Sequence, residues 1–247
     1  MKILITNDDG IFSEGLIALA KLLSLKHKVV VYAPDGNRSG FSRSMTFHKD
    51  ITVKKVNISD DFESYSISGT PCDCVKYGIY NEKGKVDLVV AGINYGSNIA
   101  YDVVYSGTVN ACLEASFIGY KSIAFSNAGK HDEDFDFNEN CKFIDTIFDK
   151  LVEISSVDYV LNVNIPPIKA KDIKGTKICR VGKRIYTDVY EKTGENTVKL
   201  TGEPILESIN GTESDDYMVE NGYVSVSPIT SSPLDEITYN KYKDFKF

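Results

Sequence analysis

The chain has 247 residues, 42% hydrophobic and 26% charged, which is typical of a globular protein with one large α/β domain or two small ones. Its formal net charge of -7 argues against a broad surface for duplex nucleic acid or an acidic membrane. A bound divalent ion together with Arg38 and Arg43 would still make the potential positive locally.

The cysteine content and the N-terminal segment indicate a cytoplasmic protein. The five cysteines are scattered and odd in number, which indicates reduced thiols and not a disulfide framework. The apolar run at Met1–Thr6 is too short for a signal peptide or a transmembrane span. We therefore expect a cytoplasmic protein without membrane partners.

Strands and helices alternate in the first part of the chain. A short buried strand at Ile3–Thr6, a helix at Ser13–Leu25 and a strand at Val29–Ala33 form a predicted right-handed β-α-β unit. The elements expected next are a loop or lid at Asn37–Lys49, a solvated hairpin of Thr52–Val56 and Ser64–Ser68, a helix at Pro71–Tyr80, a strand at Asp87–Ala91, a helix at Thr108–Gly119, a strand at Ser122–Ser126, a helix at Asn138–Ile154 and a strand at Tyr159–Asn164.

The pattern changes after Pro166 and Pro167. The later segments are β-like with no clear helix between them, at Lys177–Val181, Arg184–Tyr190, Thr197–Thr201 and Tyr223–Pro228. The sequence therefore predicts an α/β fold, with a doubly wound and mostly parallel sheet flanked by helices. We assign this core to residues 1–175 and a β-rich C-terminal extension to residues 176–247.

Four polar patches follow predicted strands or open a helix: Asn7–Gly10, Arg38–Gly40, Gly92–Asn98 and Tyr105–Thr108. The carboxyl ends of parallel strands share one edge of a sheet, and ligands bind in the crevice there. Residues far apart in the sequence are therefore expected to meet at one site.

The first patch carries two adjacent carboxylates, Asp8 and Asp9. Such a pair repels itself unless a positive charge lies beside it, and Mg²⁺ or Mn²⁺ favours oxygen ligands of this kind. Aspartate and glycine are also common turn residues. This patch alone leaves metal binding and turn formation equally open.

The other patches are also ambiguous when each is taken alone. Ser39 is an ordinary loop serine unless it lies at the same edge as the aspartates. Asn94 and Asn98 either stabilise their own loop or offer a carbonyl ligand and an amide donor to a phosphate. Ser106-Gly107-Thr108 is a helix N-cap, and the same geometry makes an anion site.

Several well-known motifs are absent from the sequence. There is no Walker A loop, no GxGxxG fingerprint and no HExxH motif. Among the three histidines, only His48 in the predicted lid is a candidate proton-transfer group, and His27 and His131 are expected at the surface. The acidic stretch Asp132–Glu139 is predicted to be an exposed loop and helix start.

Taken together, the four patches resemble the SurE (survival protein E) family of metal-dependent 5'/3'-nucleotidases. The resemblance extends to Gly69-Thr70-Pro71, Leu161–Pro166 and Gly222–Pro228, and so runs over nearly the whole chain. It is loose around Ile178–Lys192 and at Asp132–Glu139, which affects the expected substrate preference and assembly more than the chemistry.

The resemblance implies a Rossmann-like core and hydrolysis of nucleoside 5'- or 3'-monophosphates to nucleoside and phosphate, in some members also of short polyphosphate. It further implies homodimers or homotetramers in which a C-terminal β-hairpin exchanges between subunits. One divalent cation, Mg²⁺ or Mn²⁺, would be held by Asp8, Asp9, Ser39 and Asn94. The implied catalytic residues are Asp8, Asp9, Asn98, Ser106 and Thr108, and the implied substrate- or phosphate-binding residues are Ser39, Asn98, Ser106, Gly107 and Thr108.

Two other functions are alternatives to this one. A haloacid-dehalogenase-type phosphatase needs a second aspartate two positions after the first, where this chain has Gly10. A non-catalytic nucleotide-binding module on the same scaffold would bind nucleotide tightly without turnover. A pocket for the base is expected near Phe41–His48 and an aromatic residue such as Tyr95 or Tyr105.

Overall fold

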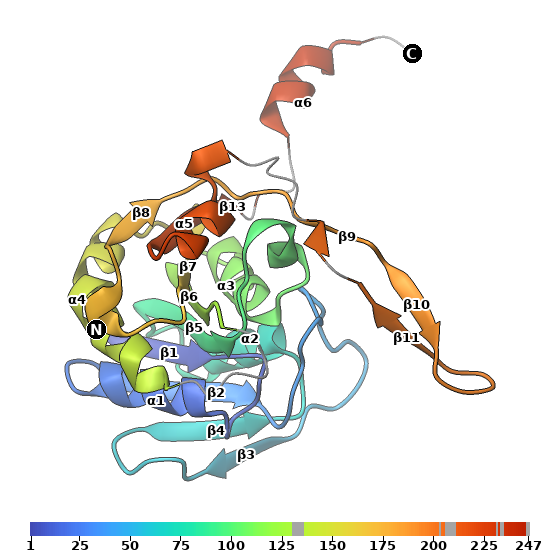
Figure 1. The fold of residues 1–247 in the computed structure, drawn as a ribbon. Helices are drawn as coiled ribbons and strands as arrows, with labels where there is room; N and C mark the ends of the chain where they lie inside the picture. The colour runs from blue at the N-terminus through green and yellow to red at the C-terminus, as the bar shows by residue number, and fades with distance from the viewer. Residues whose placement is uncertain (130–135, 203, 206–210, 231, 233–234, 246–247) are drawn as a thin grey trace.

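A computed structural model describes residues 1–129, 136–202, 204–205, 211–230, 232 and 235–245. Within these residues the main sheet has nine strands in the order β3-β4-β2-β1-β5-β6-β7-β13-β8 (Figure 1). Its parallel centre consists of β2 (Lys28–Pro34), β1 (Lys2–Thr6), β5 (Leu88–Tyr95), β6 (Ser122–Asn127) and β7 (Tyr159–Ile165). The prediction of an α/β fold with a mostly parallel sheet is confirmed.

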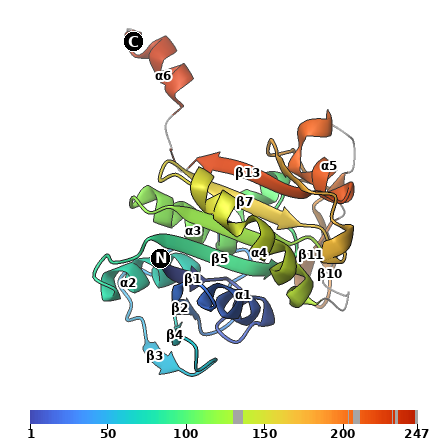
Figure 2. The ribbon, with the colours of Figure 1, turned by 90° about the vertical axis from the view of Figure 1, so that its left-hand side faces the viewer.

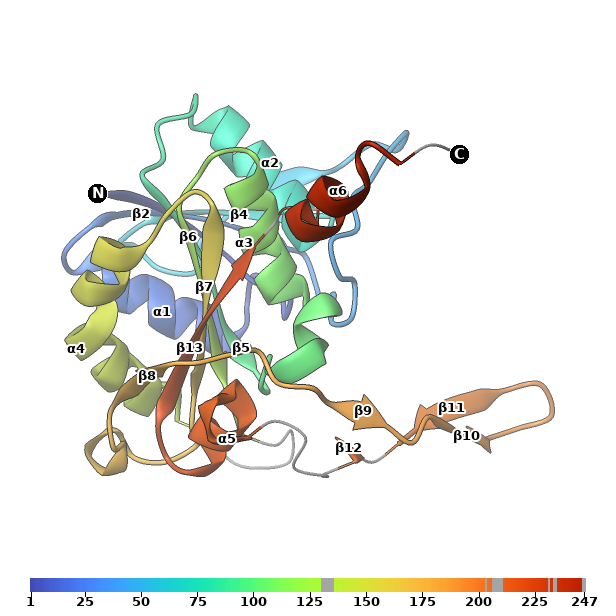
Figure 3. The same ribbon diagram turned by 90° about the horizontal axis from the view of Figure 1, so that it is seen from above.

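Helices cover both faces of this sheet, as Figures 2 and 3 show. On one face, α1 (Glu14–Ser24) and α4 (Phe137–Ile154) pack over a core that contains Leu16 and Ile144. On the other face, α2 (Pro71–Asn81) and α3 (Gly107–Phe117) pack over a second core that contains Val75 and Val109. Two covered faces explain why the central strands are apolar along most of their length.

The alternation of side chains along β1 shows how this arrangement arises from the sequence. Ile3 and Ile5 belong to the first core and Leu4 to the second, and all three are fully buried. Successive residues of a strand point to opposite faces, so a strand covered on both faces needs apolar residues throughout. The apolar run therefore ends where the strand ends, and the polar residues that follow lie at the edge of the sheet.

The direction in which successive strands are added to the sheet reverses at β1, although β1 is parallel to both of its neighbours. From β1 the chain passes to β2 and β4 (Glu63–Ile67) on one side, and it later returns to β5 on the other side of β1. This makes the carboxyl ends of β1 and β5 the topological switch point, where open α/β sheets bind their ligands.

The predicted hairpin is present but not solvated on both strands. β3 (Val53–Val56) pairs antiparallel with β4, and β4 also pairs parallel with β2 inside the main sheet. Ser64, Ser66 and Ile67 of β4 are buried as a result. The expectation of a solvated hairpin was wrong for β4, because alternating polar residues do not reveal that small serines can be buried between strands.

The C-terminal part has two features that extend from the body. An arm is formed by β9 (Ile185–Tyr186), paired with β12 (Pro204–Ile205), and by β10 (Val189–Lys192), paired with β11 (Val198–Thr201). Figures 1 and 3 show this arm leaving the body, and α6 (Glu236–Tyr242) leaving it elsewhere. Between them, β13 (Val224–Thr230) pairs antiparallel with β7 and parallel with β8 (Thr176–Ile178).

The helices of the extension were not predicted. Besides α6, they are α5 (Asp215–Glu220) and the short 3-10 helix η3 (Gly211–Glu213); earlier in the chain lie η1 (Ala100–Val104) and η2 (Ala170–Asp172). Helix α5 depends on tertiary contacts, since the Asp215 carboxylate accepts hydrogen bonds from the N–H groups of Ala100 at 3.0 Å and Gly182 at 2.9 Å. The six residues of α5 are also too few to show a helical hydrophobic period in the sequence.

Strand β5 is longer than predicted. It runs to Tyr95 because Ile93 is fully buried, and because Asn94 and Tyr95 pair with β6 after a register shift. His131 and Asp132–Asp134 lie outside the described residues. None of the described helices combines the length and the apolar character needed to cross a membrane.

Candidate active site

The turn after β1 is held by residues other than the two aspartates. The Asn7 side chain donates to the Gly10 carbonyl at 3.0 Å and to Ser13 Oγ at 2.6 Å, and it accepts from the Gly10 N–H at 3.2 Å. Gly10 has φ +110°, a conformation that glycine adopts readily. The side chains of Asp8 and Asp9 are therefore free of the turn, and their contacts are to α3 and β5.

Asp8 is buried beneath the first turn of α3. Its Oδ1 accepts a hydrogen bond from Thr108 Oγ1 at 2.5 Å. Gly107 packs so closely that a Cβ there would lie 2.7 Å from Asp8 Cβ and 2.8 Å from Oδ2. Burial raises the pKa of Asp8, although hydrogen bonds from Thr108 and from the backbone N–H groups of Asp8, Thr108 and Gly107 oppose the rise.

Asp9 is half-buried and reaches toward β5. Its Oδ2 accepts from the Tyr95 N–H at 3.4 Å. Burial and the neighbouring charge of Asp8 raise the pKa of Asp9 to about 6, with the Tyr95 hydrogen bond acting the other way. Because Tyr95 follows Asn94, this contact places the predicted residues of β1 and β5 side by side.

No lysine or arginine of the described residues forms an ion pair with Asp8 or Asp9. Arg38 pairs with Asp35 at 2.7 Å, and Arg43 pairs with Glu114 at 2.9 Å. Each arginine is thus paired with a carboxylate of its own, and the expectation that they act together with a divalent ion to make the potential positive stays a prediction. Two adjacent carboxylates with raised pKa values and no paired cation are a chemical fit for a divalent ion.

Ser39 and Asn94 offer oxygen atoms at the same edge. The Arg38 N–H donates to the Asp8 carbonyl at 2.6 Å, so Ser39 follows directly on a contact with Asp8. Ser39 is exposed, and its hydroxyl has no hydrogen-bond partner within the described chain. The Asn94 amide nitrogen donates to the Gly96 carbonyl at 2.8 Å, which leaves Oδ1 without a described partner.

The donor set would be carboxylate, hydroxyl and amide oxygens. In the part of the chain that the structure describes, no three or more His, Cys, Asp and Glu side chains are grouped as a metal cluster. Asp8, Asp9, Ser39 and Asn94 instead offer the hard oxygen ligands that Mg²⁺ and Mn²⁺ prefer.

Ser106 has the capping role that the sequence left open. Its Oγ accepts from the Val109 N–H at 3.0 Å and so caps α3. The Asn110 side chain ties this turn down by donating to the carbonyls of Val103, Val104 and Ser106 at 2.8–3.1 Å. The N–H groups at the start of α3 face Asp8, where an anion is favoured.

Asn98 is buried in a network of polar side chains. Its backbone N–H donates to Asn164 Oδ1 at 2.8 Å, and its amide nitrogen donates to Ser126 Oγ at 2.9 Å. Its carbonyl accepts from Asn162 at 2.7 Å and Asn164 at 3.1 Å. Sequence reasoning missed these three partners, although two asparagines in the apolar strand β7 were a signal for buried hydrogen bonds.

The predicted lid is anchored to the body at several points. Ser42 bonds to the carbonyls of Tyr105 and Val104, and the Thr46 N–H donates to Asp73 at 3.1 Å. His48 is exposed, and its ring contacts that of Phe47. Among the described residues, no hydrogen bond or ion pair joins the His48 side chain to the candidate site.

A family model described as "Survival protein SurE" matches residues 3–188, well over half of the chain. The chain belongs to the SurE family. Two relatives named "5'-nucleotidase SurE" align along almost their whole length with this SurE-family chain. The one from Clostridium beijerinckii is 40% identical over 236 residues, which is 93% of this chain and 92% of the relative. The one from Pseudothermotoga lettingae is 40% identical over 241 residues, covering 96% and 91%.

A solved structure agrees with this assignment. The crystal structure of the SurE protein from Aquifex aeolicus has a TM-score of 0.82 and 37% sequence identity, and covers 98% of both chains. The SurE resemblance inferred from the four polar patches is therefore confirmed at the level of family and fold.

Proposed function

We propose that this chain is a phosphomonoesterase that hydrolyses nucleoside monophosphates to nucleoside and phosphate. The observation that carries the proposal is the pair Asp8 and Asp9 at the switch point of the sheet, without an ion-paired cation among the described residues. Asp8 faces the N-terminus of α3 and Asp9 faces β5. The printed names of the relatives, 5'-nucleotidase, support the same activity. Action on 3'-monophosphates and on short polyphosphate is part of the proposal.

We further propose that Asp8, Asp9, Ser39 and Asn94 hold one Mg²⁺ or Mn²⁺ ion. The ion would offset the charge that develops on the phosphate and lower the pKa of a water molecule. The two aspartates support this assignment, because their burial without a paired cation is unfavourable until positive charge is supplied.

The start of α3 would bind the phosphate. The Ser106 hydroxyl hydrogen is a donor at the positive end of this helix, and the N–H groups of Gly107 and Thr108, which hydrogen-bond to Asp8 in this structure, would be shared between Asp8 and the phosphate. Asn98 uses one N–H of its amide for Ser126, and the second remains for a phosphate oxygen. Donors fixed in place before the substrate arrives stabilise the transition state without reorganisation.

Asp9 is better placed than Asp8 to orient the attacking water. The Oδ1 of Asp8 is engaged by Thr108, and the residue is 3% exposed. Asp9 is half-buried, and only its Oδ2 accepts the Tyr95 N–H. Its Oδ1 would hold the water in line with the phosphorus and take up its proton.

The test is phosphate release from 5'- and 3'-nucleoside monophosphates and short polyphosphate, with Mn²⁺, Mg²⁺ or EDTA. Asp8→Asn removes one proposed ligand, and Asp145→Asn is the matched control, because Asp145 is an exposed residue of α4 paired with Lys26. We expect release that needs the metal, is lost in Asp8→Asn and persists in Asp145→Asn. Tight nucleotide binding without any release would favour the binding module, and full activity of folded Asp8→Asn would refute the metal site.

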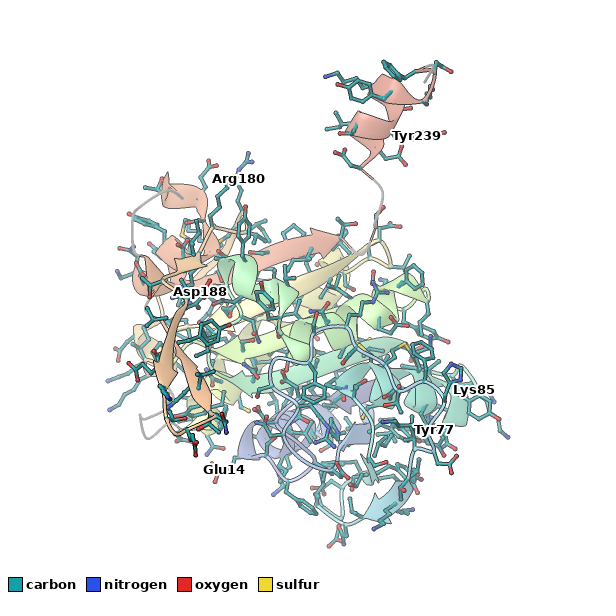
Figure 4. All side chains as sticks on the ribbon, turned by 90° about the vertical axis from the view of Figure 1, so that its right-hand side faces the viewer. Glu14, Tyr77, Lys85, Arg180, Asp188 and Tyr239 are labelled. Atoms are coloured by element: carbon teal, nitrogen blue, oxygen red, sulfur yellow. The ribbon has the colours of Figure 1, made fainter. Side chains whose placement is uncertain are left out.

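We also propose that the chain forms a homodimer or homotetramer through its C-terminal extension. The arm exposes Val189, Val198 and Leu200, and α6 buries none of its residues in this single chain. Figure 4 shows Tyr239 and the other side chains of α6 standing apart from the body of the molecule. Apolar side chains on projecting elements are usual where a second subunit covers them, and light scattering coupled to gel filtration would measure the mass.

Two further expectations remain proposals. We place the boundary between core and extension at residue 175, and β8 and β13 return the extension to the main sheet. We propose a cytoplasmic location, supported by five buried cysteines, all of them free thiols.

A further inference from the structure

A cavity of about 640 Å³ opens between η1 and the arm, next to the start of α3. Its lining combines aromatic, aliphatic and charged side chains, among them Tyr101, Asp102, Tyr105, Arg184, Tyr186 and Leu200. A few convergent polar groups among apolar walls are typical of small-molecule sites, and this volume lies within their usual range. Asp188, which is labelled in Figure 4, marks the part of the arm that lines this cavity.

The polar groups of the cavity are organised around Asp102. Its Oδ2 accepts from Arg184 Nη1 at 3.1 Å and from the Tyr186 hydroxyl at 2.7 Å. Its Oδ1 has no hydrogen-bond partner among the described residues. The two partners hold the carboxylate in one orientation and leave an acceptor oxygen available to a ligand that carries N–H or O–H groups.

The same residue connects the cavity to the proposed phosphate site. The Asp102 carbonyl accepts from the N–H groups of Tyr105 at 3.0 Å and Ser106 at 3.2 Å, and Ser106 caps α3. The Tyr105 carbonyl in turn accepts from the Ser42 N–H at 3.1 Å. The wall of the cavity and the start of α3 are thus parts of one hydrogen-bonded segment.

Tyr105 presents its ring to solvent at this junction. It is 67% exposed, although its backbone is fixed on both sides. Exposed aromatic rings on a fixed backbone are platforms on which nucleic-acid bases stack, with little dependence on the base. A phosphate bound at the start of α3 would place its attached nucleoside beside this ring.

We propose that the cavity binds the nucleoside part of the substrate, with the base stacked on Tyr105 and the Asp102 carboxylate accepting hydrogen bonds from donor groups of the nucleoside. This inference rests on the proposed function and adds to it a specificity-determining residue. Asp102 selects compounds with a donor in the right place, because an acceptor left unpaired on binding costs affinity.

Titration calorimetry of the full chain with nucleosides, in EDTA, tests the cavity without phosphate, metal or turnover. The probes are adenosine, 2'-deoxyadenosine and uridine, which separate a ribose hydroxyl from a base amino group as the donor that Asp102 reads. The variants are Tyr105→Ala, Tyr105→Phe and Asp102→Asn. Tyr80→Ala is the control, since Tyr80 is a 79% exposed tyrosine of α2.

We expect Tyr105→Ala to weaken the binding of all three nucleosides about tenfold or more, as loss of base stacking does. Tyr105→Phe and Tyr80→Ala should bind them as the unmodified chain does. Asp102→Asn should reduce the difference in binding affinity between at least two of the three nucleosides. The inference is overturned if the unmodified chain binds no nucleoside at millimolar concentration, or if folded Tyr105→Ala binds as tightly as the unmodified chain.

A second assay separates this inference from the proposed function. The ratio of kcat/KM for adenosine 5'-monophosphate to that for glycerol phosphate should fall in Tyr105→Ala, because only the first substrate carries a base. Absence of phosphate release from either substrate by the unmodified, metal-loaded chain would refute the proposed function, and the calorimetry would still decide whether nucleosides bind.

Discussion

Glu114 should hold the loop of residues 37–49 against α3. This carboxylate is 4% exposed and accepts from Arg43 Nε at 2.9 Å and from Lys76 Nζ at 3.1 Å. Arg43 also lies over the Phe117 ring, 4.7 Å from its centroid. Glu114→Gln keeps the shape of the side chain and removes its charge, so it tests the electrostatic contribution to loop anchoring.

The size of the effect follows from the exposure of the two cations. Breaking a fully buried ion pair costs about 3–5 kcal/mol. The side chains of Arg43 and Lys76 are 31% and 43% exposed and keep part of their hydration, so the cost here is smaller. We expect Glu114→Gln to lower the free energy of unfolding by about 1–2 kcal/mol, and the more exposed Lys76 pair to contribute about 0.2–1 kcal/mol.

Urea unfolding of a double-mutant cycle measures this directly. The cycle combines Glu114→Gln with Arg43→Met, which preserves the aliphatic contact with Phe117, and a parallel cycle uses Lys76→Met. We expect a coupling of about 1 kcal/mol for Arg43 and a smaller one for Lys76. A coupling of zero between Glu114 and Arg43, with both single variants folded, would refute the view that charge holds the loop.

Three further outcomes are expected. Mn²⁺ should raise the thermal midpoint of the unmodified chain and not that of Asp8→Asn, in a thermal shift assay, because a ligand of the folded state stabilises it; equal shifts would place the ion elsewhere. Gly15→Ala puts a Cβ 2.1 Å from the Ile93 carbonyl oxygen and should cost about 1–3 kcal/mol in urea unfolding, whereas at Gly36 the nearest atom is 3.8 Å away and alanine should be tolerated. Burial raises the pKa of Glu82, but hydrogen bonds from Lys2 and Tyr32 outweigh this and lower it below the ordinary 4.5. The contribution of Glu82 to the free energy of unfolding is therefore complete above pH 4.5, and it is lost as the pH falls through the lowered pKa of the folded state. The difference in unfolding free energy between the unmodified chain and Glu82→Gln should therefore shrink in acid. A difference that stays constant with pH would contradict this assignment.

The central sheet was predictable because both of its faces are covered. Apolar runs such as Ile3–Thr6 and Val29–Ala33 mark strands whose neighbours follow from the β-α-β rule. Signals of this kind are lost where an element depends on distant partners. Helix α5 forms around the Asp215 carboxylate, which binds the backbone of η1, and no local pattern reveals that contact.

The candidate site was predictable in its residues more than in its contacts. Polar patches at strand ends indicated Asp8 and Asn94. In the structure, the residues that follow them, Asp9 and Tyr95, are joined by a hydrogen bond. The pairing of Arg38 with Asp35 could not be foreseen, because it depends on the path of a loop. Arginines near a predicted anion site are therefore weak evidence until their carboxylate partners are known.

The two ends of the outer part of the arm lie next to each other. Val189 pairs with Thr201 in the β10–β11 ladder, and a Cβ on Gly202 would lie 3.1 Å from the Asp188 nitrogen. A chain that joins Asp188 directly to Gly202 would keep every strand of the main sheet. A change in the length of this hairpin would therefore alter the proposed subunit contacts and the cavity wall at Leu200, while every strand of the main sheet keeps its place.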